Sequence, residues 1–82
     1  MTEEEIKKEL IEMAQKIGVI IKPSDIGALM SEPNLYIYEA FCDQTNEPYY
    51  WRNISNFRKT GFDTKRALFL HKEYLKILDN GI

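Results

Sequence analysis

The sequence predicts a mainly α-helical protein, a compact bundle of four or five short helices. Apolar residues recur at helical spacing near both ends of the chain. Each of these segments begins with a residue type that favours helix N-caps. The chain has 82 residues, of which 44% are hydrophobic. This length supports one small core and no second one, so residues 1–82 are expected to form a single domain.

The first predicted helix covers residues 3–17. Thr2 and Glu5 stand three residues apart, which is the spacing of a capping box. Gly18 follows as the expected stop, because glycine readily adopts the left-handed conformation that ends helices. The apolar positions at helical spacing are Ile6, Leu10, Met13, Ala14 and Ile17.

Residues 19–33 predict a connector and a short second helix. Val19–Lys22 reads as a buried connector or a stub of strand, and Pro23 breaks it. Ser24 is the expected cap of a helix that ends before Pro33. The inward positions of this helix would be Ile26, Leu29 and Met30.

Residues 34–62 fit two structures. In the helical interpretation, Asn34 caps a helix that runs through Cys42, and Asn46 caps another that ends at Gly61. In the alternative, Leu35–Cys42 and Tyr49–Ser55 are the strands of a hairpin. The fold would then be α+β, with the order helix, helix, β-hairpin, helix. The caps and the basic turn before Gly61 favour helices.

The last predicted helix starts after the cap residue Asp63 and ends at Asn80-Gly81. Its apolar residues fill one continuous arc of a helical wheel. We expect this arc to pack against the first helix. The two core stripes would be Ile6, Leu10, Met13 and Ile17 against Leu68, Leu70, Tyr74, Leu75 and Leu78.

The chain lacks the residue sets that common catalytic and metal sites need. One cysteine, Cys42, and one histidine, His71, cannot supply the four ligands of a structural zinc site. Cys42 also cannot form an intrachain disulfide, which together with the acidic start predicts a cytoplasmic location. No apolar run is long enough to cross a membrane. We therefore expect no enzyme activity, cofactor, metal or membrane partner, and we expect His71 to be a hydrogen-bonded core residue.

Charge is distributed unevenly along the sequence. Residues 1–48 carry a net charge of −6, residues 49–72 carry +5 and residues 73–82 carry −1. Such a split favours a charged partner.

Residues 49–66 interleave aromatic and cationic side chains, as protein and nucleic-acid interfaces do. Phe69 stands in the polar arc of the last helix, where no core neighbour is expected. The predicted function is therefore a small non-catalytic protein that regulates or inhibits a larger protein partner. The alternative is a nucleic-acid-binding accessory protein, and homodimerisation through Phe69 is a third hypothesis. The predicted binding residues are Trp51, Arg52, Arg58, Lys65 and Phe69.

A second candidate surface is acidic. Glu5, Glu9 and Glu12 share a flank of the first helix. Carboxylates at this spacing can occupy a basic channel built for phosphates. If the partner is a nucleic-acid-handling enzyme, these three residues would face its channel.

Overall fold

Helices and one short turn follow one another along the described part of the chain. The computed structural model describes residues 1–46 and 51–80, except for the side chains of residues 51 and 52. The described ranges contain no strand, which confirms the mainly α-helical bundle. The elements are α1 (Glu3–Lys16), η1 (Pro23–Asp25, a 3-10 turn), α2 (Ile26–Ser31), α3 (Pro33–Gln44), α4 (Trp51–Lys59) and α5 (Thr64–Asn80).

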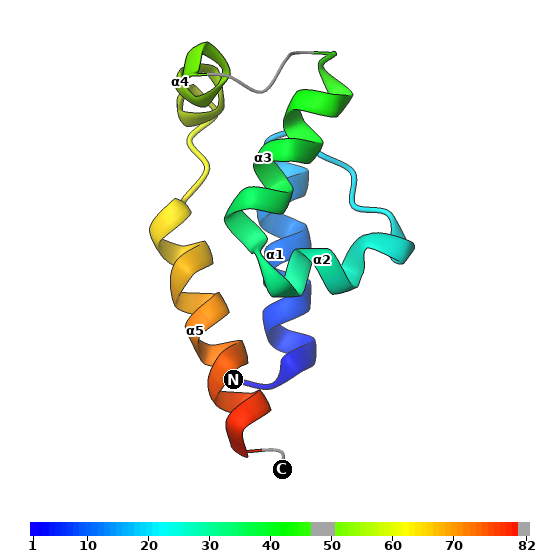
Figure 1. Ribbon diagram of the computed structural model, residues 1–82, viewed down its shortest axis with the longest axis vertical. Helices are drawn as coiled ribbons and strands as arrows, with labels where there is room; N and C mark the ends of the chain where they lie inside the picture. The colour runs from blue at the N-terminus through cyan, green and yellow to red at the C-terminus, as the bar shows by residue number, and fades with distance from the viewer. Residues whose placement is uncertain (47–50, 81–82) are drawn as a thin grey trace.

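The helices α1, α3 and α5 build the body of the bundle (Figure 1). The first described helix, α1, packs against the last one, α5, and α3 packs against both α2 and α5. The shorter helix α4 lies at one end of the bundle and packs on α3. The longest dimension of the molecule is 40 Å, against 24 and 19 Å for the other two.

Local signals set the bounds of α1. Thr2 Oγ1 accepts the backbone N–H of Glu5 at 3.2 Å, and Glu5 Oε1 accepts the backbone N–H of Thr2 at 3.0 Å. This is the predicted capping box. These hydrogen bonds, first of all the one from the Thr2 backbone, lower the pKa of Glu5. Gly18 follows the helix with φ at +82°, a conformation that costs glycine little.

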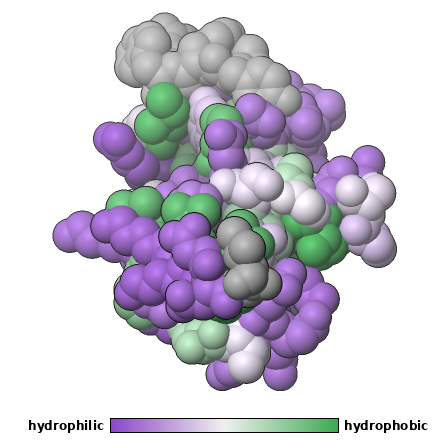
Figure 2. Space-filling model, turned by 60° about the horizontal axis from the view of Figure 1, so that its bottom comes forward, coloured by the Kyte–Doolittle hydropathy of each residue, from purple (hydrophilic) through white to green (hydrophobic). Residues whose placement is uncertain are grey.

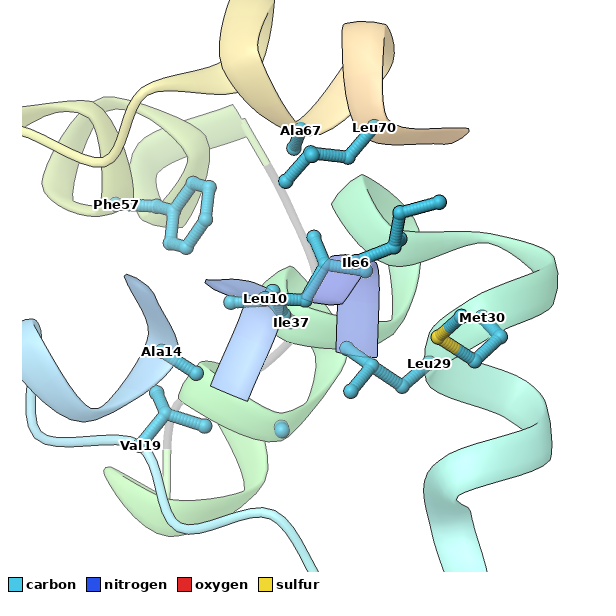
Figure 3. Close-up of a cluster of buried hydrophobic side chains, with 11 residues drawn as sticks. Ile6, Leu10, Ala14, Val19, Leu29, Met30, Ile37, Phe57, Ala67 and Leu70 are labelled. Carbon is cyan, nitrogen blue, oxygen red and sulfur yellow. The ribbon is translucent and has the colours of Figure 1, made fainter. Parts of the chain in front are cut away.

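The core is formed where α1 meets α5, α3 and α2. Figure 3 shows Ile6 and Leu10 of α1 close to Ala67 and Leu70 of α5, with side chains of α2 and α3 nearby. These side chains are almost wholly excluded from water. Removing this apolar surface from water is the main force that holds the helices together. The buried apolar cluster also includes Ala14, Val19, Leu29, Met30, Ile37, Ala40 and Phe57.

The predicted core stripe of α5 is wrong at three positions. Leu68, Leu75 and Leu78 are between 45% and 49% exposed, whereas Leu70 is fully buried. The reason is geometric. The apolar arc of α5 is wider than the surface that its neighbours cover, and the covered stripe consists of Ala67, Leu70, Tyr74 and Ile77.

Two predicted caps are also wrong. Ser24 lies inside the turn η1, and α2 has no side-chain hydrogen bond at its start. Asn34 lies within α3, which Pro33 begins. The Asn34 amide instead donates to the Thr64 carbonyl at 3.3 Å, so it links the start of α3 to the start of α5.

The structure decides between the two interpretations of residues 34–62. The predicted first strand, Leu35–Cys42, lies within α3, and residues 51–55 of the predicted second strand lie within α4. Its residues 49–50 are outside the described ranges, as are residues 47–48 after the predicted cap Asn46. The hairpin alternative is therefore wrong. At the other end of this region, Asp63 caps α5 as predicted, because its Oδ1 accepts the Arg66 N–H at 2.9 Å.

Residues 19–22 form a connector rather than a strand. The Gln44 side chain binds the backbone of Ile20 at both polar groups. Gln44 Oε1 accepts the Ile20 N–H at 3.1 Å, and Gln44 Nε2 donates to the Ile20 carbonyl at 2.9 Å. An amide side chain thus replaces the strand partner that the connector lacks.

A tyrosine joins α3 to η1 and gives a test of this packing. The Tyr36 hydroxyl donates to Asp25 Oδ2 at 2.7 Å. Burial and this carboxylate raise the pKa of Tyr36 to about 12. Because the folded pKa lies above the ordinary value of about 10, the stability that the protonated hydroxyl contributes is present below about pH 10. It is lost as the pH rises through that value towards 12.

We expect Tyr36 to ionise in the late part of an alkaline titration followed by tyrosinate absorbance, together with Tyr38, whose pKa is also raised. The variant Tyr36→Phe should reduce the amplitude of this late step by one tyrosine and lower the free energy of unfolding by about 1 kcal/mol. An unchanged late step in the variant would show that the hydroxyl of Tyr36 does not contribute to it.

Candidate binding surface

The side of α5 that faces away from the core combines cations with one aromatic ring. Helical spacing places Lys65, Phe69, Lys72 and Lys76 on one side of α5. All four are exposed, and Phe69 is 43% exposed. We call these four residues together with Arg66 the basic–aromatic face. A large aromatic ring left in water among cations is typical of interaction surfaces.

Arg66 connects this face to the rest of the bundle. Its guanidinium lies over the Phe69 ring, with 4.8 Å between the guanidinium carbon and the ring centroid. The same guanidinium makes two hydrogen bonds to the Glu9 carboxylate of α1. Arg66 Nε donates to Oε2 at 2.5 Å, and Nη2 donates to Oε1 at 2.9 Å. A bidentate pair of this kind fixes the plane of the guanidinium, and therefore orients the cation above the ring.

The electrostatics of the pair agree with its geometry. The hydrogen bond from Arg66 lowers the pKa of Glu9, and the Glu9 carboxylate raises the pKa of Arg66. Since the folded pKa of Glu9 is depressed, its contribution to stability is present above the ordinary glutamate pKa and is lost as the pH falls through the folded value. The pair is partly open to solvent, so its main effect is to orient Arg66 rather than to stabilise the fold.

Comparison with known proteins finds no relative of this chain. No protein-family model, curated protein or solved structure matches this chain. The proposed function therefore rests on the side chains of the basic–aromatic face alone.

The predicted binding residues fall into two groups. Lys65 and Phe69 share the outer side of α5, and Arg58 is exposed at the end of α4. Trp51 and Arg52 are in the first turn of α4, and their side chains lie outside the described ones. Arg66 ends the predicted basic–aromatic segment 49–66 but is not among the five predicted binding residues. The available signal was its position three residues before Phe69, which places the two side chains on neighbouring parts of one helix surface.

The three predicted acidic residues have different surroundings. Glu5 caps its own helix and Glu9 binds Arg66. Glu12 is exposed, and with Glu9 it lines an open groove of about 520 Å³ between α1 and the turn before α5. Lys16 lines the same groove, so its charge is mixed. An acidic docking face on α1 stays a prediction, and Glu12 is its freest member.

The described residues include no candidate metal cluster and no candidate membrane span. Within residues 1–46 and 51–80, no group of three or more histidine, cysteine, aspartate or glutamate side chains could hold a metal ion. None of the described helices combines the length and the apolar character that a membrane span requires. The expected hydrogen bond of His71 is not found at Nδ1, which is buried without a partner, so that expectation is wrong for this atom.

Proposed function

We propose that this chain is a small non-catalytic protein that binds and regulates a larger protein partner through the basic–aromatic face of α5. The observation that carries the proposal is the exposed Phe69 ring beneath a guanidinium that Glu9 holds in place. Aromatic residues and arginine are enriched where binding energy concentrates in interfaces.

Preorganisation supports this proposal. A free arginine side chain loses several rotatable bonds when it is immobilised in a complex. Arg66 is already fixed by its two hydrogen bonds to Glu9, so less entropy remains to be lost on binding. The lysines beside Phe69 would favour a partner with an acidic rim around an apolar pocket. Regulation then requires only that binding covers or displaces a functional part of that partner.

The test compares Phe69→Ala with a matched control. Each tagged protein would be used to capture partners from a lysate of the cells that make it, and the captured protein would then be purified and titrated. We expect Phe69→Ala to weaken binding by about 30-fold or more, which corresponds to about 2 kcal/mol at a central aromatic contact. The control is Ile20→Ala, because Ile20 is 73% exposed and lies in the connector between α1 and η1.

Three outcomes separate the alternatives. Weaker binding by Phe69→Ala together with unchanged binding by Ile20→Ala supports the proposal. Equal affinity of the wild type and both variants refutes it. If the partner's activity is unchanged at saturation with the wild type, the chain binds without regulating.

A nucleic-acid-binding accessory protein is the second candidate. Arg58, Lys59 and Lys65 are exposed at the end of α4 and the start of α5. Binding of short DNA or RNA through these cations would weaken steeply with salt, because phosphate contacts release counterions. Fluorescence anisotropy at low and physiological salt measures this directly. Absence of binding at low salt would eliminate this candidate.

A further inference from the structure

A second exposed surface of α5 is apolar and distinct from the basic–aromatic face. Leu68, His71, Leu75 and Leu78 follow one another at spacings of three, four and three residues, which is the repeat of a helix-packing seam. The three leucines are nearly half exposed. We call these four residues the leucine strip. Leu68 and Phe69 project about 100° apart around the helix, so the two surfaces can bind independently.

The leucine strip has a hollow at one end and protruding side chains at the other. Leu68 and His71 border a hollow of about 290 Å³ together with Glu32, Pro33, Asn34 and Leu35 at the start of α3. Leu35 is 49% exposed and extends the apolar surface beyond α5. Leu75 and Leu78 lie one to two turns further along and border no part of this hollow. Figure 2 shows the lower end of the molecule, where exposed apolar groups lie among largely hydrophilic ones.

We propose that the leucine strip binds a second copy of this chain, with the two α5 helices antiparallel about a two-fold axis beside Lys72 and Glu73. This symmetry exchanges the two ends of the strip. Leu78 of each copy would enter the hollow beside Leu68 of the other, and Leu75 would pack against His71. One surface thereby supplies both the protruding side chain and the hollow, as a two-fold interface requires.

Charge complementarity supports this occupant. Lys65 and Asp79 lie on the same flank of the strip, seven residues to either side of Lys72, and both are exposed. An antiparallel two-fold contact places Lys65 of each copy opposite Asp79 of the other, which gives two ion pairs. They outnumber the one like-charged contact that the same symmetry makes between the two Lys72 side chains beside the axis. The arrangement differs from dimerisation through Phe69, because that ring lies on the other exposed side of α5.

The first experiment measures the mass of the full chain by sedimentation equilibrium from about 1 µM to about 1 mM, a range that covers typical weak dimers. The expected result is a reversible transition from 9.7 kDa to twice that mass. Leu75→Lys should raise the dissociation constant by about 100-fold or more, since each dimer loses two buried leucines and gains two charges. Circular dichroism should be unchanged, because Leu75 is 45% exposed in one copy.

Two further variants distinguish this contact from nonspecific association through exposed apolar side chains. Ile20→Lys places the same charge at an exposed apolar residue away from α5, and it should leave the dissociation constant within about twofold of the wild type. His71→Leu should tighten the dimer, because it completes the apolar repeat.

The arrangement of the helices is tested by exchanging charges. Lys65→Glu and Asp79→Lys should each weaken the dimer, and the double variant should recover most of the loss. A double variant weaker than both single variants overturns the antiparallel arrangement. A wild type that stays monomeric at about 1 mM overturns the dimer itself. A monomeric wild type leaves the function proposed for Phe69 untouched, because that function is tested by the binding of a captured partner to Phe69→Ala. Lys65 belongs to both surfaces, so Lys65→Glu is read for the dimer alone.

Discussion

Replacing Leu70 with alanine is expected to lower the free energy of unfolding by about 2–5 kcal/mol. Leu70 is fully buried where α5 meets the other helices of the core. The variant removes apolar contacts and leaves a cavity that the packed helices fill only in part. Small domains have about 5–15 kcal/mol of stability in total, so the variant would lose a large part of its stability.

Urea denaturation followed by circular dichroism measures this loss. The matched control is Leu75→Ala in dilute solution, because it makes the same deletion on the same helix at a residue that is 45% exposed. Its cost should stay below about 1 kcal/mol. Equal losses from the two variants would contradict the packing of α5, since a wider apolar contact would then bury both residues.

Replacing Phe57 with alanine is expected to cost about 3–5 kcal/mol and to detach α4 from the bundle. Phe57 is 5% exposed, and its ring lies among three other rings. The centroid distances are 5.6 Å to Tyr38, 5.5 Å to Phe41 and 5.2 Å to Phe62. These rings belong to α3 and to the turn before α5, so one side chain joins α4 to two other parts of the chain.

Hydrogen exchange with mass spectrometry distinguishes detachment from global unfolding. Amides of α4 should lose protection in Phe57→Ala while those of α1 and α5 keep most of theirs. Phe69→Ala is the control, because it deletes the same ring from an exposed position. Uniform loss of protection across all helices would mean that α4 is not a separable unit.

The sequence allowed good prediction where the signals are local. The bounds of α1 follow from Thr2, Glu5 and Gly18, which lie within or next to the helix that they delimit. The start of α5 follows from Asp63 in the same way. By contrast, the connector is held by hydrogen bonds between Ile20 and Gln44, which are 24 residues apart. No pattern in the sequence indicates that Gln44 makes these bonds.

The helical wheel predicted the direction in which each α5 side chain points, but it did not predict how much of that side chain other helices cover. Leu68, Leu75 and Leu78 lie in the apolar arc, yet whether they are covered depends on where α3 begins and how far α5 extends past that point. The pairing of Arg66 with Glu9 spans 57 residues, so no local spacing indicates it. Phe69 was recognisable from its position alone, because an aromatic residue among lysines breaks the amphipathic pattern.

The packing of α1 against α5 has a kinetic consequence. Contacts that bury Ile6 and Leu10 join the two ends of the described chain, so closing them costs the entropy of a long loop. An isolated helix of the length of α1 is only marginally stable in water. During synthesis, the part of α1 that α5 covers therefore stays exposed to water until α5 has been made. We therefore expect the core between α1 and α5 to fold late in synthesis.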